Sequence, residues 1–216
     1  TKAFDEVREA RLKCSYDFLK QDIINLVAES KEGIGRVRQI VKDLKDFSRI
    51  GDTDWQWTDI HQCIDSTLNI VRNELKYHCT VTRSYGPLPK IRCLASQLNQ
   101  VLMNLLVNAG QAIEGQGEIT ITTLLDGEDA IKVLIEDSGK GIAPDAMPHI
   151  FEPFFTTKPV GKGTGLGLSL AWSIIERHRG KMEVASEPGL GATFTITLPI
   201  NPRAATDMDS AGELHG

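Results

Sequence analysis

The sequence predicts an α+β protein, in which a long-helix hairpin remnant precedes a two-layer α/β sandwich of a mixed sheet with three helices. Two observations lead to this prediction. Between Lys20 and Ser48 there is no proline, and apolar residues recur at alternating steps of three and four, which indicates one long helix. After Asp59, segments with helical spacing alternate with segments of alternating apolar and polar residues, as is typical of helices packed on a sheet.

The composition excludes several classes of protein. With 41% hydrophobic and 25% charged residues in 216, the chain is not disordered throughout. Its net charge of −5 argues against a module that neutralises phosphates, so we expect no nucleic-acid partner. No segment is apolar over the roughly 18 residues of a membrane span. Four scattered cysteines without a CxxC pair suit a reducing compartment, so we expect a cytoplasmic location, whether or not the parent protein is anchored in a membrane.

Residues 1–50 are predicted to form the helical hairpin remnant, and residues 51–58 a linker. A narrow apolar seam of this kind suits helix-on-helix packing, so we expect a bundle with a second copy of the chain. A single helix docked on its own globular domain is the alternative. The seam consists of Ile23, Val27, Ile34, Val37, Val41 and Leu44.

Residues 59–200 are predicted to form one domain, followed by a disordered tail at 201–216. We expect helices at 59–76, with Asp59 as N-cap, at 96–113 and at 168–179. Strands are expected at 79–85, 118–125, 130–136, 182–186 and 193–199. The second and third of these strands should form a hairpin about Asp126-Gly127.

The first motif is a stripe of side-chain amides along the helix predicted at 96–113. An amide oxygen can ligate Mg²⁺, and an amide NH₂ can donate to a phosphate. A solvated helix face explains the stripe equally well. The amides belong to Gln97, Gln100, Asn104, Asn108 and Gln111, opposite an apolar, core-facing side.

The second motif, Asp137-Ser138-Gly139-Lys140-Gly141, follows a predicted strand. An aspartate at a strand end can accept a hydrogen bond from an exocyclic amine such as that of adenine. The glycines let the backbone approach a flat ring closely. A plain tight turn is the competing interpretation.

The third motif, Phe151-Glu152-Pro153-Phe154-Phe155-Thr156-Thr157-Lys158, has three aromatics within five residues. It is typical of the hinge of a flap whose rings anchor on the domain, with Lys158 directed to a phosphate. A small satellite cluster under a long loop is compatible with this. We expect residues 144–164 to be the least ordered part of the domain without nucleotide.

The fourth motif, Gly161-Lys162-Gly163-Thr164-Gly165-Leu166-Gly167-Leu168, leads directly into a predicted helix. Backbone N–H groups of alternating glycines and the helix N-terminus together favour an anion. The motif is neither a P-loop nor the dinucleotide fingerprint, because its spacing fits neither.

In this order, the four motifs resemble the N, G1, F and G2 boxes of sensor histidine kinases, which share the Bergerat-type fold with DNA gyrase, MutL and related chaperones. The resemblance covers Trp57 to Pro199, and Gly189 to Phe194 looks like the family's final box. The helix ending VRQIVKDLKDFSR is similar to the second helix of the dimerisation and phosphoacceptor hairpin. It is closest to nitrogen-regulator-type kinases, as are NAGQAI and PFFTTK.

The resemblance implies that the protein binds ATP or ADP with Mg²⁺. By it, Asp137 binds the adenine amine in a pocket shaped by Gly139 and Gly141. Asn108 ligates Mg²⁺. Asn104, near the metal and phosphates, and Lys158, at the γ-phosphate, are the catalytic candidates. The residues implied to cover the phosphates are Gly163, Thr164, Gly165, Leu166 and Gly167.

The implied activity is transfer of the γ-phosphate to a histidine and then to the receiver domain of a response regulator, in a homodimer held by the hairpin. Gyrase-type ATPases carry a water-activating glutamate at the position of Asn104, and an amide cannot act as that base. A gyrase-like ATPase and a nucleotide-binding pseudokinase that switches a partner are the alternatives. Gln111 departs from the pattern, since many kinases of the family have a basic residue there.

A second departure concerns the acceptor. The sequence has no histidine before His61, and we expect the chain to begin just downstream of the acceptor histidine. None of the histidines present is predicted to be the phosphoacceptor, and each is expected at the surface. They are His61, His78, His149, His178 and His215.

Overall fold

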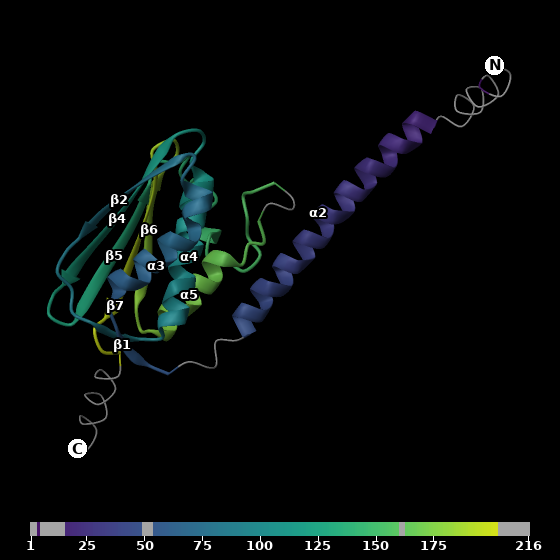
Figure 1. Cartoon of the computed structure of the whole chain (residues 1–216). Coiled ribbons are helices and arrows are strands. Elements are labelled where there is room, and N and C mark those ends of the chain that lie inside the picture. The colour runs from purple at the N-terminus through teal and green to yellow at the C-terminus, as the bar shows by residue number, and fades with distance from the viewer. Residues whose placement is uncertain (1–3, 5–15, 49–53, 160–162, 203–216) are drawn as a thin grey trace.

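A computed structural model describes residue 4 and residues 16–48, 54–159 and 163–202 (Figure 1). The helices are α2 (Tyr16–Ser48), α3 (Ile60–Leu75), α4 (Ala95–Ala112), α5 (Gly167–Arg177) and the 3₁₀ helix η1 (Met147–His149). The strands are β1 (Gln56–Thr58), β2 (Cys79–Tyr85), β3 (Ile91–Cys93), β4 (Gly117–Asp126), β5 (Ala130–Asp137), β6 (Lys181–Glu187) and β7 (Gly191–Pro199).

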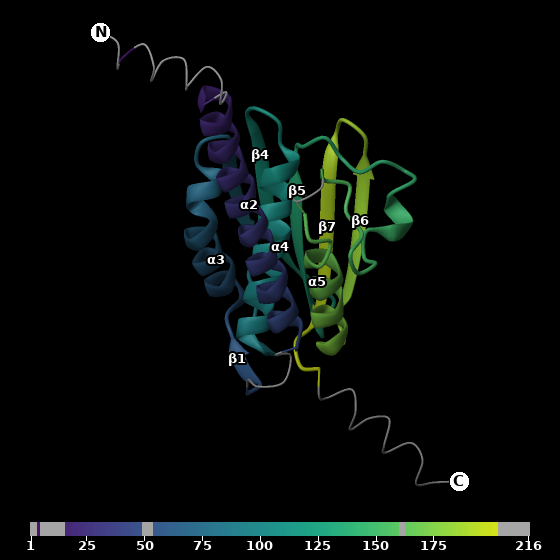
Figure 2. The same ribbon diagram turned by 90° about the vertical axis from the view of Figure 1, so that its right-hand side faces the viewer.

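Five strands form a mixed sheet in the order β2-β4-β5-β7-β6, in which β2 and β4 are parallel and all other neighbours antiparallel. Helices α3, α4 and α5 cover one face of this sheet, with α4 in the middle (Figure 2). The two layers are seen edge-on in Figure 1. The predicted α+β sandwich is therefore confirmed.

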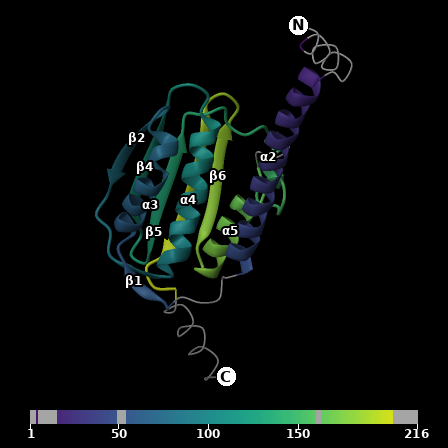
Figure 3. The same ribbon diagram turned by 45° about the vertical axis from the view of Figure 1, so that its right-hand side comes forward.

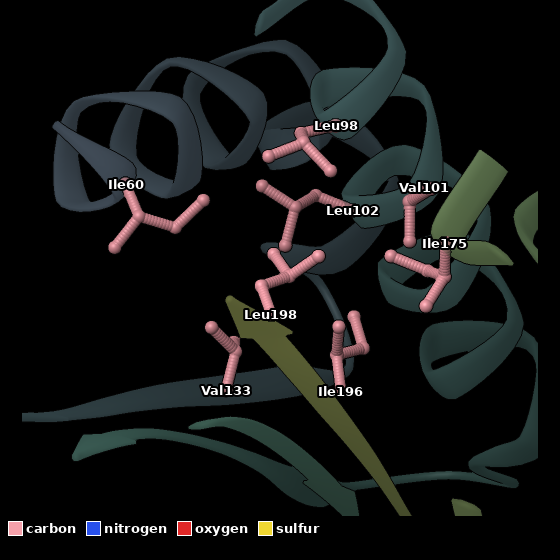
Figure 4. Close-up of a pocket in the computed structure, with 8 residues that line it drawn as sticks. All are labelled: Ile60, Leu98, Val101, Leu102, Val133, Ile175, Ile196 and Leu198. Atoms are coloured by element: carbon pink, nitrogen blue, oxygen red, sulfur yellow. The ribbon is translucent and has the colours of Figure 1, made fainter. Parts of the chain in front are cut away.

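The core lies between these layers, and strict alternation along the strands builds it. Ile131, Val133 and Ile135 of β5 all point towards the helices and are buried. On β7 they lie opposite Leu198, Ile196 and Phe194, which are all buried. On β4, Ile121 and Thr123 are the buried partners of Ile135 and Val133, whereas Leu125, opposite Ile131, is exposed. Figure 4 shows where this face of the sheet meets α3, α4 and α5 around an apolar cavity of about 10 Å³. None of the predicted site residues lines this cavity.

Local signals in the sequence explain most element boundaries. The Asp59 side chain accepts a hydrogen bond from the backbone N–H of His61, which makes it the predicted N-cap of α3. The hairpin of β4 and β5 closes at the Asp126–Ala130 pair, where Gly127 has a φ of 69°. The helices and strands predicted within residues 59–200 agree with the observed ones to within two residues at either end, whereas α2 begins four residues before the predicted start at Lys20.

The sequence did not predict the second sheet, in which β1 pairs with β3 in antiparallel register. Each of these strands has three residues, which is too short for alternation to be recognised. Their pairing brings the chain entering from residue 54 against the segment that leads into α4.

One predicted surface residue is buried. His178 is 1% exposed at the end of α5, which corrects the expectation that every histidine lies at the surface. Its Nε2 accepts from the backbone N–H of Leu94 at 3.0 Å, and its Nδ1 lies 2.7 Å from the carbonyl oxygen of Ile174. The Trp55 ring stacks at a tilt, with its centroid 5.0 Å from that of the imidazole. In the sequence, His178 stands between Arg177 and Arg179, a pattern that predicts an exposed position.

Helix α2 projects away from the sandwich (Figure 1). Of the predicted seam, the structure describes the side chains of Ile23, Val27 and Ile34, and all three are exposed. The other seam positions lie outside the residues whose side chains are described, as do most of residues 1–15 and the tail from residue 203. In the described part of the chain, no helix is long and apolar enough to cross a membrane.

Candidate functional site

The predicted site residues converge on α4, the middle helix. Figure 3 shows α4 flanked by α3 and α5 in front of the sheet. Three members of the amide stripe, Asn104, Asn108 and Gln111, follow one side of α4 at steps of four and three. Asn104 and Asn108 are half-buried and Gln111 is exposed. Asn104 contacts the fourth motif at Gly167, and Asn108 and Gln111 both contact Lys158 of the third motif.

Asp137 occupies the last inward-facing position of β5, directly after Ile131, Val133 and Ile135 in the alternation. Its residue surface is only 4% exposed. Burial raises the pKa of its carboxyl group, while the backbone N–H groups of Gly139 and Ala192 offset part of that rise. The Gly139 N–H donates to Oδ1 at 2.9 Å. A buried carboxylate with this few donors is suited to accept from a ligand N–H.

The loop after Asp137 is held between α4 and the turn that joins β6 to β7. The Lys140 N–H donates to the carbonyl oxygen of Ala112, and the Gly189 N–H donates to the carbonyl oxygen of Lys140. Gly139 and Gly141 fit because they lack a Cβ: one added at Gly139 would lie 2.7 Å from the Ala112 carbonyl oxygen. At Gly141, with φ 70°, it would lie 2.2 Å from that of Glu187.

Gly191 has a role that the sequence did not reveal. It has a φ of 99°, and a Cβ there would lie 1.8 Å from the carbonyl oxygen of Asp137. The glycine therefore lets β7 pass directly beside the end of β5. The sequence signal was present in the segment Gly189 to Phe194, but its contact with Asp137 depends on the order of strands in the sheet.

The third and fourth motifs meet at their backbones. The Phe154 N–H donates to the carbonyl oxygen of Gly165 at 2.9 Å, and both residues have positive φ values of 68°. Phe151 packs on Trp172 of α5 with ring centroids 4.6 Å apart, and Phe155 lies near His149. Phe154 is 67% exposed. The prediction that the rings anchor on the domain therefore holds for Phe151 and Phe155 but is wrong for Phe154.

The second half of the fourth motif leads into α5 as predicted. Gly167 is the first residue of α5, and its carbonyl oxygen accepts from the Asn104 side-chain NH₂ at 2.9 Å. Leu166 is buried, and Gly163, Thr164 and Gly165 are half-buried. No acidic residue occupies the first turn of α5, so its N-terminal partial charge is not neutralised there. Gly161 and Lys162 lie outside the described residues.

Lys158 joins the third motif to the amide stripe. Its Nζ donates to Asn108 Oδ1 at 3.0 Å and to Gln111 Oε1. Burial lowers the pKa of the Lys158 ammonium, and the charge of Lys140 lowers it further. The contact with Gln111 was not predicted, because the two residues are 47 positions apart and the segment that carries Lys158 has no regular secondary structure.

The donors available to a metal are amides and not carboxylates. Among the residues that the structure describes, no group of three or more histidine, cysteine, aspartate or glutamate side chains could hold a metal ion. A Mg²⁺ ion in this region would depend on the Asn108 oxygen and on oxygens of a bound phosphate. The Lys158 ammonium already lies against Asn108 Oδ1, so a cation fits there.

Residues 93–202 match the profile of the family described as "Histidine kinase-, DNA gyrase B-, and HSP90-like ATPase". The chain is 38% identical over 192 residues to the signal transduction histidine-protein kinase AtoS of Escherichia coli K12, covering 87% of this chain and 30% of AtoS. It is 38% identical over 168 residues to the sensor histidine kinase ZraS of the same strain, covering 77% of this chain and 36% of ZraS. The chain thus spans about a third of the length of these relatives.

Solved structures show the same fold. A mycobacterial sensor histidine kinase, MprB, superposes with a TM-score of 0.61 at 26% identity, over 69% of this chain and 99% of that chain. Full-length ShkA in complex with AMPPNP gives 0.67 at 26% identity, over 74% and 35%. Histidine kinase ThkA in complex with the response regulator TrrA gives 0.66 at 26% identity, over 79% and 49%.

Proposed function

The chain belongs to the family of histidine kinase-, DNA gyrase B- and HSP90-like ATPases, and we propose that it is the ATP-binding catalytic part of a sensor histidine kinase. Its similarity to AtoS and ZraS supports this proposal, as does the shared fold with the catalytic domain of ThkA. In the full protein, the reaction is transfer of the γ-phosphoryl group of ATP to a histidine, and from there to an aspartate of a response regulator.

Asp137 is the proposed adenine-binding residue. Its buried carboxylate directly precedes the loop that contains Gly139 and Gly141. In this proposal, it accepts a hydrogen bond from the exocyclic amine of adenine. Guanine carries a carbonyl at that position, which would set two acceptors against each other. This arrangement therefore favours ATP and ADP over GTP.

The phosphates are proposed to lie between the amide stripe and the N-terminus of α5. Gly163, Thr164, Gly165, Leu166 and Gly167 lead into that helix end, where the backbone N–H groups favour an anion. Asn108 is the proposed Mg²⁺ ligand, because its oxygen already contacts one cation in the structure. When bound, the metal would neutralise charge on the phosphates. Lys158 is close enough to Asn108 to contact the terminal phosphate of a nucleotide bound there.

The observation that carries the choice of transfer over hydrolysis is the environment of Asn104. Its NH₂ donates to the Gly167 carbonyl, so the side chain links α4 to the first residue of α5. An amide cannot remove a proton from water. At the position of Asn104 the site therefore has no base for hydrolysis. In the transfer, the P–N bond to the acceptor histidine forms as the bond from the γ-phosphorus to the β,γ-bridging oxygen breaks, and ADP leaves with that oxygen.

The proposed partners follow from the same assignment. ThkA was solved with a response regulator, and we propose a receiver domain as the partner of the full protein here. Exposed Ile23, Val27 and Ile34 on α2 support dimerisation with a second copy. Such a hairpin would bring the acceptor histidine of the full protein within reach of the ATP site.

The test supplies the acceptor separately. The 216-residue chain is incubated with γ-labelled ATP and Mg²⁺, with or without a helical hairpin carrying a histidine from a related kinase. We expect acid-labile, base-stable label on the added hairpin, and little label on the chain itself, since no histidine occurs before His61. Rapid release of free phosphate without labelling would instead identify a gyrase-like ATPase. Nucleotide binding without either reaction would identify a pseudokinase.

A further inference from the structure

The side-chain ammonium of Lys158 is held by two amide oxygens of α4. Nζ donates to Asn108 Oδ1 at 3.0 Å and to Gln111 Oε1. Asn108 and Gln111 are three residues apart and therefore lie on the same side of the helix, so both can reach one donor. No residue in this triad belongs to the apolar core, and their contacts do not contribute to any sheet or helix ladder.

The rest of Lys158 is also fixed. Its backbone N–H donates to Thr156 Oγ1 at 3.2 Å. A Cβ added at Gly163 would lie 3.2 Å from Lys158 Cδ and 3.3 Å from its Cβ, so the stem of the lysine packs closely on this glycine. The side chain is thus confined between the glycine and α4, which directs its charged end to Asn108 and Gln111.

Both acceptors are neutral. The ammonium therefore donates two hydrogen bonds but meets no opposite charge at Asn108 and Gln111, and Lys140 is a like charge in its surroundings. A contact of this kind orders a side chain without holding it as firmly as a carboxylate would. The lysine can therefore exchange these two hydrogen bonds for a contact with another group.

Holding two cations on Asn108 Oδ1 at once is unfavourable. A Mg²⁺ ligated by that oxygen at about 2.1 Å would stand within about 5 Å of an ammonium on the same atom, and the two positive charges repel each other. This repulsion favours release of the ammonium from Asn108 when its oxygen ligates the metal. A phosphate entering with the metal offers Lys158 an opposite charge, which the two amides do not.

We propose that Asn108 and Gln111 form a seat for the Lys158 ammonium in the nucleotide-free protein, and that Lys158 exchanges this seat for the phosphate when Mg·ATP binds. Gln111 is the positioning residue that sets how readily the exchange occurs. A neutral amide at this position holds the ammonium while leaving it exchangeable. This proposal rests on the proposed function, and specifies how that same site passes from its empty to its loaded state.

The experiment compares Gln111→Ala and Gln111→Glu with wild type, and uses Gln62→Glu on the exposed surface of α3 as the charge-matched control. The first readout is hydrogen exchange of residues 155–159 in the nucleotide-free protein. The second is the Mg²⁺ concentration at which the affinity for a non-hydrolysable ATP analogue has risen halfway to its maximum. A Lys158→Met background completes a double-mutant cycle with each Gln111 variant.

We expect Gln111→Ala to speed exchange at residues 155–159 about fivefold or more without nucleotide, with little change once Mg·analogue is bound. Gln111→Glu should slow exchange and raise the required Mg²⁺ concentration, because a carboxylate holds the ammonium more firmly. In the Lys158→Met background, the effects of both variants on exchange should disappear. The Gln62→Glu control should match wild type throughout.

Three results separate the possible failures. If wild type binds the analogue but both Gln111 variants match it in exchange and in Mg²⁺ dependence, the seat is wrong and the nucleotide site stands. Persistence of the Gln111 effects in the Lys158→Met background would likewise overturn the seat, because the effects would then not act through the ammonium. If wild type does not bind the analogue at all, the proposed function itself is wrong.

Discussion

The backbones of Phe154 and Gly165 are in direct contact, with the Phe154 N–H donating to the Gly165 carbonyl oxygen at 2.9 Å. A Cβ added at Gly165 would lie 2.3 Å from the carbonyl carbon of Phe154. This contact joins the backbone just before Lys158 to the backbone just before α5. Glycine is required at this point for two reasons, its positive φ and the missing side chain.

Gly165→Ala should therefore weaken nucleotide binding strongly. The left-handed backbone alone costs an alanine about 1–2 kcal/mol, and the overlap with Phe154 adds to that. Gly127→Ala, in the turn between β4 and β5, is the matched control, because Gly127 has the same left-handed backbone with a φ of 69° and no atom within 4 Å of an added Cβ. Calorimetry with an ATP analogue and thermal unfolding measure the two effects. Equal affinities for both variants would show that the Phe154–Gly165 contact does not matter for the site.

Asp137→Asn should stabilise the nucleotide-free domain while weakening adenine binding. Burial raises the pKa of this carboxyl group in the folded state. The stability that the group contributes is therefore present below its unfolded pKa and lost as the pH rises through the folded pKa. At neutral pH the buried charge is a cost, which an amide of the same shape removes. We expect a higher Tm at pH 7.

For binding, we expect a loss of about 1–3 kcal/mol in affinity for ATP, because the amide presents a donor to the adenine amine. Glu136→Gln is the control, since it neutralises the adjacent carboxylate on the exposed face of β5. Isothermal titration measures the affinities. An unchanged ATP affinity in the Asp137 variant would remove this residue from the adenine site.

His178 should make the stability of the domain depend on pH. Because Nε2 accepts from the Leu94 N–H, the proton is on Nδ1, which donates to the Ile174 carbonyl oxygen. Burial lowers the pKa of this imidazole below its usual value of about 6.5. As the pH falls below that value, the unfolded chain binds the proton first, so the folded state loses stability.

Urea unfolding between about pH 7 and pH 5 tests this prediction. The His178→Gln variant keeps an acceptor but cannot titrate, so we expect a lower stability at pH 7 and a flatter pH profile than in wild type. A His178 variant with the full wild-type slope would assign the pH dependence to other groups.

The seam on α2 should be needed for dimerisation. Val27→Lys places a charge within the apolar row of Ile23, Val27 and Ile34, and should shift the chain towards monomer. Asn25→Lys introduces the same single charge at an exposed position of α2 outside that row. Sedimentation equilibrium at several concentrations measures the association of both variants and of wild type. If both variants associate equally, the row is not the interface.

Periodicity made most of the architecture predictable from the sequence. Helices and long strands follow from regular apolar spacing, and a single aspartate, Asp59, marks the start of α3 through its side chain. The short strands β1 and β3 could not be predicted, because three residues carry no period. His178 escaped for another reason. Its partner Leu94 is 84 positions away, and only the packing of α5 against α4 brings the two together.

The site was predictable as a set of motifs, but not as a set of contacts. The types of residue at 104, 108, 137 and 158 predict a nucleotide site, and the structure places these residues on α4, at the end of β5 and, for Lys158, against Asn108. The pairing of Lys158 with Gln111 and the passage of Gly191 beside Asp137 remained hidden. Both depend on the three-dimensional course of irregular segments, for which sequence spacing holds no rule.

The alternation of β5 ties the position of the carboxylate to the packing of the core. Asp137 continues the row of Ile131, Val133 and Ile135, and its partner across the sheet is Ala192. A slip of this strand by one residue against its neighbours would turn all four side chains to the opposite face of the sheet. The register that buries the three apolar side chains therefore also holds the carboxylate on the helix side, and a strand-pairing error would disrupt the core and the candidate site together.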